Sequence, residues 1–129
     1  MKNLLSSIFF LLITAGSCFA QDKTIAVAKN AFQTANITSL SHYLHAEVAV
    51  IVENDESIAG KSATENELKS FFAKHAVTHF EFIHQGSSKD GKVFVVGKYE
   101  CADGSYRIRL NLKNYGNEYL IDSIDLGKE

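Results

Sequence analysis

Five side chains in the C-terminal third of the chain have types and spacing suited to chemistry: Tyr99, Cys101, Tyr106, Ser123 and Asp125. On the strand register derived below, they converge at one end of the buried face of a sheet, with Tyr106 opposite Asp125. A carboxylate in apolar surroundings has a raised pKa and can act as a general base, and tyrosine hydroxyls can stabilise an oxyanion. The same groups can also bind a ligand without catalysis, or lie in water at a frayed edge. Because nothing in the sequence fixes Asp125 inside a pocket, we assign no catalytic residue. We interpret four of the five as candidate ligand-binding residues: Tyr99, Tyr106, Ser123 and Asp125.

The histidines do not form a complete metal site by their spacing. His42 and His45 are three positions apart and His75 and His79 are four apart, but a zinc site needs three or four ligands. No glutamate lies between His75 and His79, as a zinc protease would require. We therefore expect solvated or helix-capping histidines, with no bound metal and no other cofactor. His84 falls on the apolar face of the predicted sheet, where we expect a hydrogen-bonded core histidine, with a general base as the alternative. It is also a candidate ligand-binding residue.

Cys101 is the single cysteine after residue 20. A Cys–His nucleophile needs a histidine close to the thiol, and none is predicted on the neighbouring strands. We expect a packed thiol, with an intermolecular disulfide as the alternative in an oxidising compartment. An exported domain with one cysteine has no internal disulfide, so its stability must come from a packed core.

The first twenty residues have the order of a secretory signal peptide. A charged start at Lys2 is followed by an apolar run from Leu4 to Ala15 and by small residues that end at Ala20. The run is shorter than the roughly 20 apolar residues of a membrane span. We expect cleavage after Ala20 and a periplasmic or secreted protein. Lipidation at Cys18 is the less favoured alternative, and only that modification would attach the protein to a membrane.

The composition is that of a globular domain. The chain has 129 residues, of which 46% are hydrophobic and 22% charged. A net charge of −2 excludes the dense basic surface that nucleic-acid binding requires, so we expect no nucleic-acid partner. We divide the chain into a signal peptide, residues 1–20, and one domain, residues 21–129, which is long enough to bury a core.

The elements that position the candidate residues are predicted as helices first and a sheet afterwards. Apolar residues at helical spacing predict a helix that begins at Asp22 and a shorter helical piece that ends at Leu44. Residues 47–52 are apolar and β-branched and predict a strand. Residues 62–65 (Ser-Ala-Thr-Glu) have the pattern of a capping box, which predicts a helix over residues 63–75.

From Thr78 onward the apolar period changes from helical to two. Three turns that contain glycine, at residues 89–92, 102–105 and 114–117, separate four apolar segments. The sequence therefore predicts an α+β domain, with N-terminal helices packed on one face of a curved antiparallel sheet that ends in a four-stranded meander.

Centring each turn on its glycine-containing pair fixes the predicted register. It places the following pairs opposite one another: Phe82 and Tyr99, Tyr99 and Ile108, Ile108 and Ser123, Glu100 and Arg107, Arg109 and Asp122. The last two are opposite-charge pairs on the outer face. Four apolar residues also fall on that face: Phe94, Val96, Leu120 and Ile124. They predict a homodimer or, as the alternative, the scattered apolar surface of a monomer.

Several segments resemble a known family. They are "FFAKH", "FEFIHQGSSKDGKVFVVGKY", "DGSYRIRLNLK" and "YLIDSIDL". Through them, residues 24–128 resemble the exported bacterial family called domain of unknown function 4783, and the order of elements resembles the nuclear transport factor 2-like (cystatin-like) fold. The resemblance implies a cone-shaped α+β domain in the cell envelope. It implies no activity and no catalytic residues, because the wider fold includes ketosteroid isomerase-like enzymes, binding modules and dimerisation domains.

Two functions are compatible with these observations. The favoured one is a non-enzymatic module of the cell envelope that binds a small apolar ligand or another envelope protein, with Tyr99, Tyr106, Ser123, Asp125 and His84 as candidate ligand-binding residues. The alternative is a small enzyme of ketosteroid isomerase-like type, in which Asp125 is the base and Tyr99 or Tyr106 donates a hydrogen bond.

Overall fold

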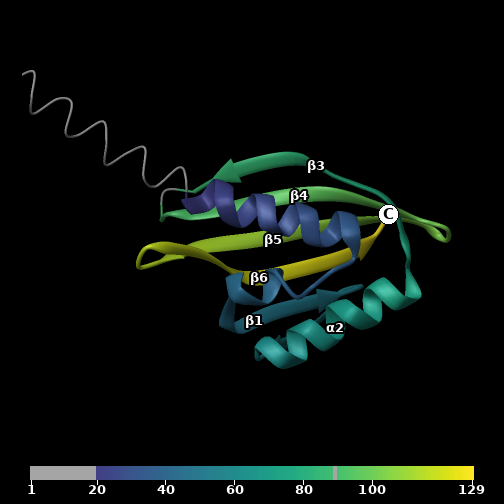
Figure 1. Cartoon of the computed structure of the whole chain (residues 1–129), viewed down its shortest axis with the longest axis horizontal. Coiled ribbons are helices and arrows are strands. Elements are labelled where there is room, and N and C mark those ends of the chain that lie inside the picture. The colour runs from purple at the N-terminus through teal and green to yellow at the C-terminus, as the bar shows by residue number, and fades with distance from the viewer. Residues whose placement is uncertain (1–19, 89) are drawn as a thin grey trace, which may run out of the picture.

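The computed structural model describes residues 20–88 and 90–129. In this part of the chain, helical segments pack on one face of a six-stranded sheet (Figure 1). They are a first helix over residues 20–34, a short 3₁₀ helix η1 (Leu40–Tyr43) and the helix α2 (Lys61–Lys74). Residues 1–19 of the predicted signal peptide lie outside the described residues, so its cleavage stays a prediction.

The sheet contains the predicted meander and one further hairpin. Its strands are β1 (Leu44–Val52), β2 (Asp55–Ala59), β3 (Val77–Ser87), β4 (Lys92–Cys101), β5 (Gly104–Tyr115) and β6 (Glu118–Lys128). Their order across the sheet is β2-β1-β6-β5-β4-β3. Neighbouring strands are antiparallel, except that β1 runs parallel to β6. The predicted α+β architecture and the meander β3–β6 are confirmed.

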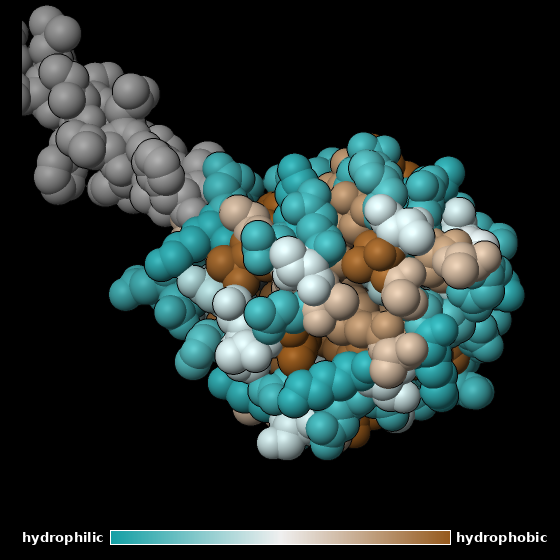
Figure 2. All heavy atoms as spheres, turned by 45° about the vertical axis from the view of Figure 1, so that its right-hand side comes forward, coloured by the Kyte–Doolittle hydropathy of each residue, from teal (hydrophilic) through white to brown (hydrophobic). Residues whose placement is uncertain are grey.

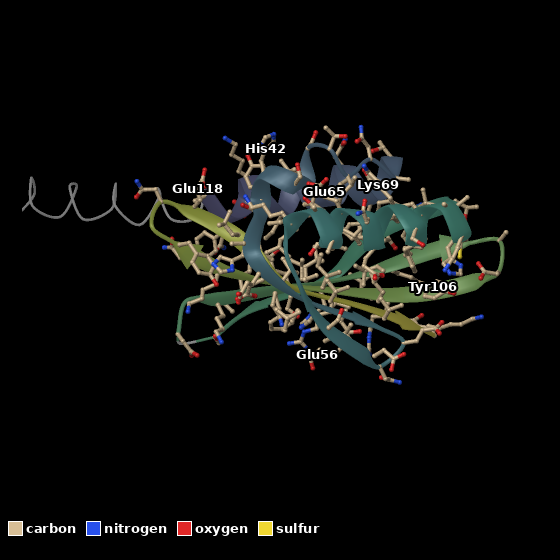
Figure 3. The ribbon with its side chains drawn as sticks, turned by 90° about the horizontal axis from the view of Figure 1, so that it is seen from below. His42, Glu56, Glu65, Lys69, Tyr106 and Glu118 are labelled. Atoms are coloured by element: carbon tan, nitrogen blue, oxygen red, sulfur yellow. The ribbon has the colours of Figure 1, made fainter. Side chains whose placement is uncertain are left out.

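The space between the helices and the sheet is filled by aromatic rings. Phe32 of the first helix is fully buried, and its ring centroid lies 5.6 Å from that of Phe72 in α2 and 5.2 Å from that of Phe80 in β3. Tyr99 of β4 completes the group, with its centroid 6.2 Å from Phe72. The first helix and α2 lie on the same side of the sheet (Figure 3), so the opposite face, which we call the outer face, carries no helix.

The helix α2 begins earlier than predicted, and the predicted capping box is wrong. Gly60 is the N-cap residue and no side chain caps the helix. Ser62 therefore lies inside the first turn, where its hydroxyl cannot serve as the cap. The Thr64 hydroxyl instead donates to the carbonyl oxygen of Gly60 at 2.9 Å, back along the helix.

A β-bulge in β6 changes which of its residues are buried. Leu112 pairs with Ile121 and Asn111 pairs with Ser123, so Asp122 is an extra residue without a partner. One extra residue reverses the alternation of side chains beyond it. Ile124 and Leu126 are consequently the buried residues of this half of β6, each 0% exposed. The prediction that placed Ser123 and Asp125 on the buried face, and Ile124 on the outer face, is wrong.

A second bulge, in β3, moves His84. Phe82 pairs with Gly97 and His84 with Val96, which leaves Ile83 as the extra residue. His84 is exposed, and its ring lies 5.5 Å from the ring of Phe94 on the outer face. The predicted core histidine is therefore wrong, for the same reason as in β6.

The β4–β5 turn is centred one residue earlier than predicted, because Cys101 pairs with Gly104 and residues 102–103 alone form the turn. The predicted Glu100–Arg107 pair is accordingly wrong. The predicted Arg109–Asp122 pair is wrong for another reason, because it spans β5 and β6, where Tyr115 pairs with Glu118 and the bulge displaces Asp122. The observed partners are Phe80 and Tyr106 for Tyr99, Gly97 and Leu126 for Ile108, Lys98 and Gly127 for Arg107, and Val96 and Asp125 for Arg109. Because the turn centre moves by one residue, the β5 partner of each β4 residue moves by two. Side chains alternate with a period of two, so each side chain of β5 stays on its predicted face.

Candidate functional site

The structure brings together only part of the predicted ligand-binding set. Tyr99 and Tyr106 are buried, with 0% and 2% exposure, on the face that the sequence predicts. Ser123 and Asp125 lie on the outer face, where Asp125 is opposite Arg109. Tyr106 is opposite Lys128 instead. The predicted convergence of Asp125 with the tyrosines therefore does not occur.

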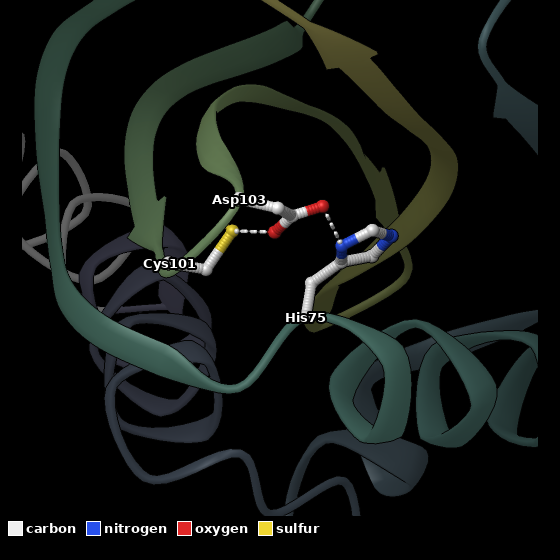
Figure 4. A group of neighbouring side chains, drawn as sticks. All are labelled: His75, Cys101 and Asp103. Atoms are coloured by element: carbon white, nitrogen blue, oxygen red, sulfur yellow. Dashed lines mark hydrogen bonds and ion pairs between the residues drawn. The ribbon is translucent and has the colours of Figure 1, made fainter.

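Other polar groups surround the buried tyrosines. The Nδ1 atom of His75 lies 2.9 Å from Oδ2 of Asp103, and the Cys101 thiol donates to Oδ1 of the same carboxylate at 2.8 Å (Figure 4). The Tyr106 hydroxyl lies 3.3 Å from each ring nitrogen of His75 and 3.5 Å from Oδ2 of Asp103. We call His75, Cys101, Asp103 and Tyr106 the end cluster.

The end of α2 and the β4–β5 turn position the cluster. His75 is the C-cap of α2, and its backbone N–H donates to the carbonyl oxygen of Phe71 at 2.9 Å. The Tyr99 hydroxyl donates to the carbonyl oxygen of His75. Cys101 ends β4 and Asp103 lies in the following turn. The end of α2, this turn and the C-terminus of the chain lie at the same end of the sheet, on the right in Figure 1.

Aromatic rings hold the imidazole of His75 from two sides. Its centroid lies 5.0 Å from the ring of Phe71 and 4.7 Å from the ring of Tyr106.

Gly104 closes the β4–β5 turn with φ of +132°, a conformation that residues with a Cβ rarely adopt. The separation of Cys101 and Asp103 is thus set by the backbone of a two-residue turn.

The surroundings of the end cluster and of Tyr99 shift the pKa values of four groups. The hydrogen bond from the Cys101 thiol, and then that from His75, lower the pKa of Asp103 to about 2. Partial burial, and then the hydrogen bond to Asp103, raise the pKa of Cys101. Burial, and then the charge of Asp103, raise the pKa of Tyr106, and burial raises the pKa of Tyr99 to about 12. At neutral pH the carboxylate is charged, while the thiol and both phenols are protonated.

This arrangement does not activate the thiol as a nucleophile. The thiol proton points to a carboxylate that is a weak base, and the imidazole contacts the other carboxylate oxygen. A histidine nevertheless lies close to Cys101, from the end of a helix and not from a neighbouring strand: ligand atoms of His75, Cys101 and Asp103 all lie within 4.8 Å of one another. The sequence analysis missed this group because His75 reaches Cys101 through tertiary packing, and no strand neighbour carries it.

A groove of about 160 Å³ runs beside the cluster, lined by His75 together with Phe71 and Lys74 of α2 and by Glu53 of the β1–β2 turn, among others. Figure 2 turns the right-hand end of Figure 1 toward the viewer and shows brown and tan residues gathered between teal ones on this side. Two other grooves have volumes of about 260 Å³ and 250 Å³. Small-molecule sites typically measure about 300–1,000 Å³, so each of these grooves is small for an organic ligand.

A sequence model of the family described as "Domain of unknown function (DUF4783)" matches residues 25–127. The chain belongs to this family. The resemblance inferred from the sequence segments is therefore confirmed. No curated protein matches the sequence.

Solved structures of this family are similar to the DUF4783 chain. A family protein from Bacteroides ovatus ATCC 8483 has 29% sequence identity and a TM-score of 0.77, over 81% of this chain and 94% of that one. A second, from Bacteroides uniformis ATCC 8492, has 31% identity and a TM-score of 0.75, over 81% and 95%.

More distant structures share the fold alone. An NTF2-like protein of unknown function from Shewanella baltica OS155 has 8% identity and a TM-score of 0.66, over 86% of this chain and 92% of that one. The predicted nuclear transport factor 2-like cone is thus confirmed. Within the described residues, no helix is both long and apolar enough to cross a membrane.

Proposed function

We propose that this DUF4783 protein is an exported, non-enzymatic protein-binding module of the bacterial cell envelope, and that its outer sheet face binds a second copy of the chain. The charged, apolar and small-residue order of residues 1–20 supports export. The division of charge on the outer face carries the proposal of protein binding.

The outer face has a basic half and an acidic half. The basic half lies over β4 and β5 and consists of Lys98, Arg107, Arg109 and Lys113. Two carboxylates lie among them: Glu100 contacts Lys98, with 3.7 Å between Nζ and Oε1, and Glu81 of β3 lies opposite Lys98. The acidic half lies over β6, β1 and β2 and consists of Asp122, Asp125, Glu47 and Glu56. Figure 3 shows Glu56 on the side of the sheet away from the helices.

Aromatic residues lie between and beneath these charges. The guanidinium carbon of Arg109 lies 4.8 Å from the ring centroid of Phe94, and the ammonium of Lys113 lies 5.7 Å from that of Tyr115. His45 stacks on Tyr115 with 4.2 Å between centroids. Interfaces are enriched in aromatic residues and arginine, so this composition favours a binding surface.

A second copy of the chain carries the complementary arrangement of charges. In a twofold dimer the same patch lies on both subunits, so a rotation can place each basic half on the partner's acidic half. Like charges in the wrong orientation would repel, which fixes how the two faces meet. Phe94, Val96 and Leu120 lie half-buried on this face and add apolar area to the proposed interface, whereas Ile124 belongs to the core.

The geometry favours this function over the two others that the sequence allows. A small apolar ligand inside the cone would compete with the packed rings of Phe32, Phe72 and Tyr99. An enzyme that uses Asp125 as its base would need this carboxylate beside Tyr99 or Tyr106, but Asp125 lies opposite Arg109 on the other face.

The test is native mass spectrometry and light scattering on protein recovered from the periplasm of a bacterium that expresses the full chain. We expect a chain that begins at Gln21 and a dimer that weakens with salt. Arg109→Glu should weaken the dimer at least about tenfold, because it places a like charge against the acidic half. Lys69→Glu, a matched charge reversal on the exposed side of α2, should leave the dimer unchanged.

Three outcomes would contradict the proposal. A chain that keeps residues 1–20 in the cytoplasm overturns export. A monomer at high concentration and low salt overturns self-association, and an envelope protein bound to that monomer through Arg109 would identify a different partner for the outer face. Equal effects of Arg109→Glu and Lys69→Glu would show that the outer face is not the interface.

A further inference from the structure

We propose that the end cluster binds one divalent transition metal ion of the zinc type, through Nδ1 of His75, Sγ of Cys101 and the carboxylate of Asp103, with a fourth coordination position left open. This inference goes beyond the proposed function, because it concerns the end of the sheet and not its outer face.

The donor set selects the class of metal. A thiolate sulfur, an imidazole nitrogen and a carboxylate oxygen are the three ligand types that proteins use for Zn²⁺. Mg²⁺ and Ca²⁺ require mostly oxygen ligands, so this mixed set disfavours both ions. Three protein ligands with one open position are typical of zinc sites that exchange water or another small ligand.

The distances suit such an ion after a small movement. The Asp103 carboxylate now bridges the other two ligands, at 2.8 Å from Sγ of Cys101 and 2.9 Å from Nδ1 of His75. In a tetrahedral site with bonds of about 2.0–2.3 Å, ligand atoms lie about 3.3–3.6 Å apart. The three ligand atoms together lie within 4.8 Å of one another, a span that must also contract around an ion. The Asp103 side chain is 46% exposed, so it can rotate to lengthen its two short contacts as the other ligands approach. Without metal, its hydrogen bonds keep the thiol and the imidazole in place.

Charge and protons balance when the ion binds. The metal forms a bond to Sγ of Cys101 as the S–H bond breaks, and the released proton passes to water. One thiolate and the Asp103 carboxylate then neutralise the two positive charges of the ion. His75 binds as the neutral imidazole, so it needs no compensating charge.

The residues around the cluster hold the ligands as an outer shell does in metal sites. The Tyr99 hydroxyl fixes the backbone of His75, while the rings of Phe71 and Tyr106 fix its imidazole. Tyr106 is therefore a positioning residue, whose hydroxyl lies 3.3 Å from the imidazole nitrogens. His75 also lines the groove beside α2, which gives an ion access from solvent.

The experiment uses residues 21–129, reduced and freed of metal with a chelator, and titrates the protein with Co²⁺ alone. We expect one Co²⁺ per chain, visible absorption of a tetrahedral ion and a near-ultraviolet thiolate-to-cobalt charge-transfer band. Added Zn²⁺ should abolish these bands by displacing Co²⁺, because zinc binds such a site more tightly. A wild-type protein that shows no charge-transfer band with equimolar Co²⁺ overturns the inference without any variant.

Matched variants locate the ion. Cys101→Ser should abolish the charge-transfer band. His75→Gln and Asp103→Asn should each weaken Co²⁺ binding by more than about 100-fold, while the exposed control His79→Gln should stay within about twofold. Circular dichroism of the metal-free proteins checks that each variant folds.

Binding that none of the three cluster variants affects would place the metal elsewhere and overturn the inference. A chain that dimerises but does not bind Co²⁺ overturns only this inference. A chain that binds Co²⁺ as a monomer overturns only the proposed self-association.

Discussion

Deletion of Asp122 should be tolerated, although it removes a residue from the middle of a strand. Asp122 is the extra residue of the β6 bulge, so its removal leaves Ile121 opposite Leu112 and Ser123 opposite Asn111. Strand alternation then becomes regular while every buried residue of β6 keeps its face. A deletion normally does the opposite, because it turns all later side chains to the other face.

The magnitude follows from burial. Without a bulge in β6, the deletion would turn Ile124 and Leu126, both 0% exposed, into solvent. At about 1.5–3 kcal/mol for each side chain, this costs about 3–6 kcal/mol. With the bulge, the loss is the hydrogen bond from the Tyr115 hydroxyl to Asp122, which is 3.3 Å long and partly exposed. We therefore expect the free energy of unfolding to fall by no more than about 1.5 kcal/mol.

Urea denaturation followed by circular dichroism measures this difference on residues 21–129. Asp122→Ala isolates the contribution of the lost hydrogen bond. Deletion of Arg107 is the control, because β5 has no extra residue there: it must turn outward either Tyr106 or Ile108 and Leu110, all of them buried, and should be strongly destabilising. If the Asp122 deletion destabilises the protein as much as the Arg107 deletion, the bulge argument is refuted.

Two further predictions test the core and the end cluster. Gly97→Ala would place a Cβ 2.5 Å from two ring atoms of Phe80, so we expect a loss of about 1–3 kcal/mol in urea denaturation. Phe80→Leu in the same chain should reduce that loss. Gly127→Ala, whose Cβ would meet its nearest atom at 3.9 Å, should be neutral, so equal losses at Gly97 and Gly127 would contradict the packing. For the cluster, the pKa of Asp103 should be about 2 by NMR titration of its carboxyl group, and Cys101→Ala should raise it toward the ordinary 3.8. Because the folded-state pKa of Asp103 is lowered, its stabilisation of the fold is present above about pH 4 and is lost as pH falls toward 2. If the pKa of Asp103 is unchanged in Cys101→Ala, the thiol is not its main hydrogen-bond partner.

The sequence predicts the elements of this fold well because they depend on local patterns. Helical spacing before residue 75, a period of two after Thr78 and three glycine-containing turns are enough for the helices and the meander. The burial of Tyr99 and Tyr106 follows from the same alternation. These features need no knowledge of which distant residues meet.

The bulges and the end cluster were harder to predict. The bulges interrupt the alternation of a strand, and the end cluster depends on contacts between residues far apart in the sequence. In β6 the buried residues are Tyr119, Ile121, Ile124 and Leu126, so the spacing is two, three and then two, and this irregularity is the one local mark of the bulge. His75 carries no such mark. Its contact with Asp103 depends on where α2 ends above the β4–β5 turn, which is a property of tertiary packing.

The β6 bulge connects the stability of the core with the proposed binding face. A strictly alternating β6 would bury Asp125 among apolar side chains, where an unpaired carboxylate costs several kcal/mol. The extra residue Asp122 lets Ile124 and Leu126 fill the core and sends Asp125 to the outer face, opposite Arg109. The same irregularity thus supplies two of the four carboxylates of the acidic half. A change that restores regular alternation by deleting Asp122 should therefore preserve the fold but remove one negative charge from the surface on which the proposed dimer depends.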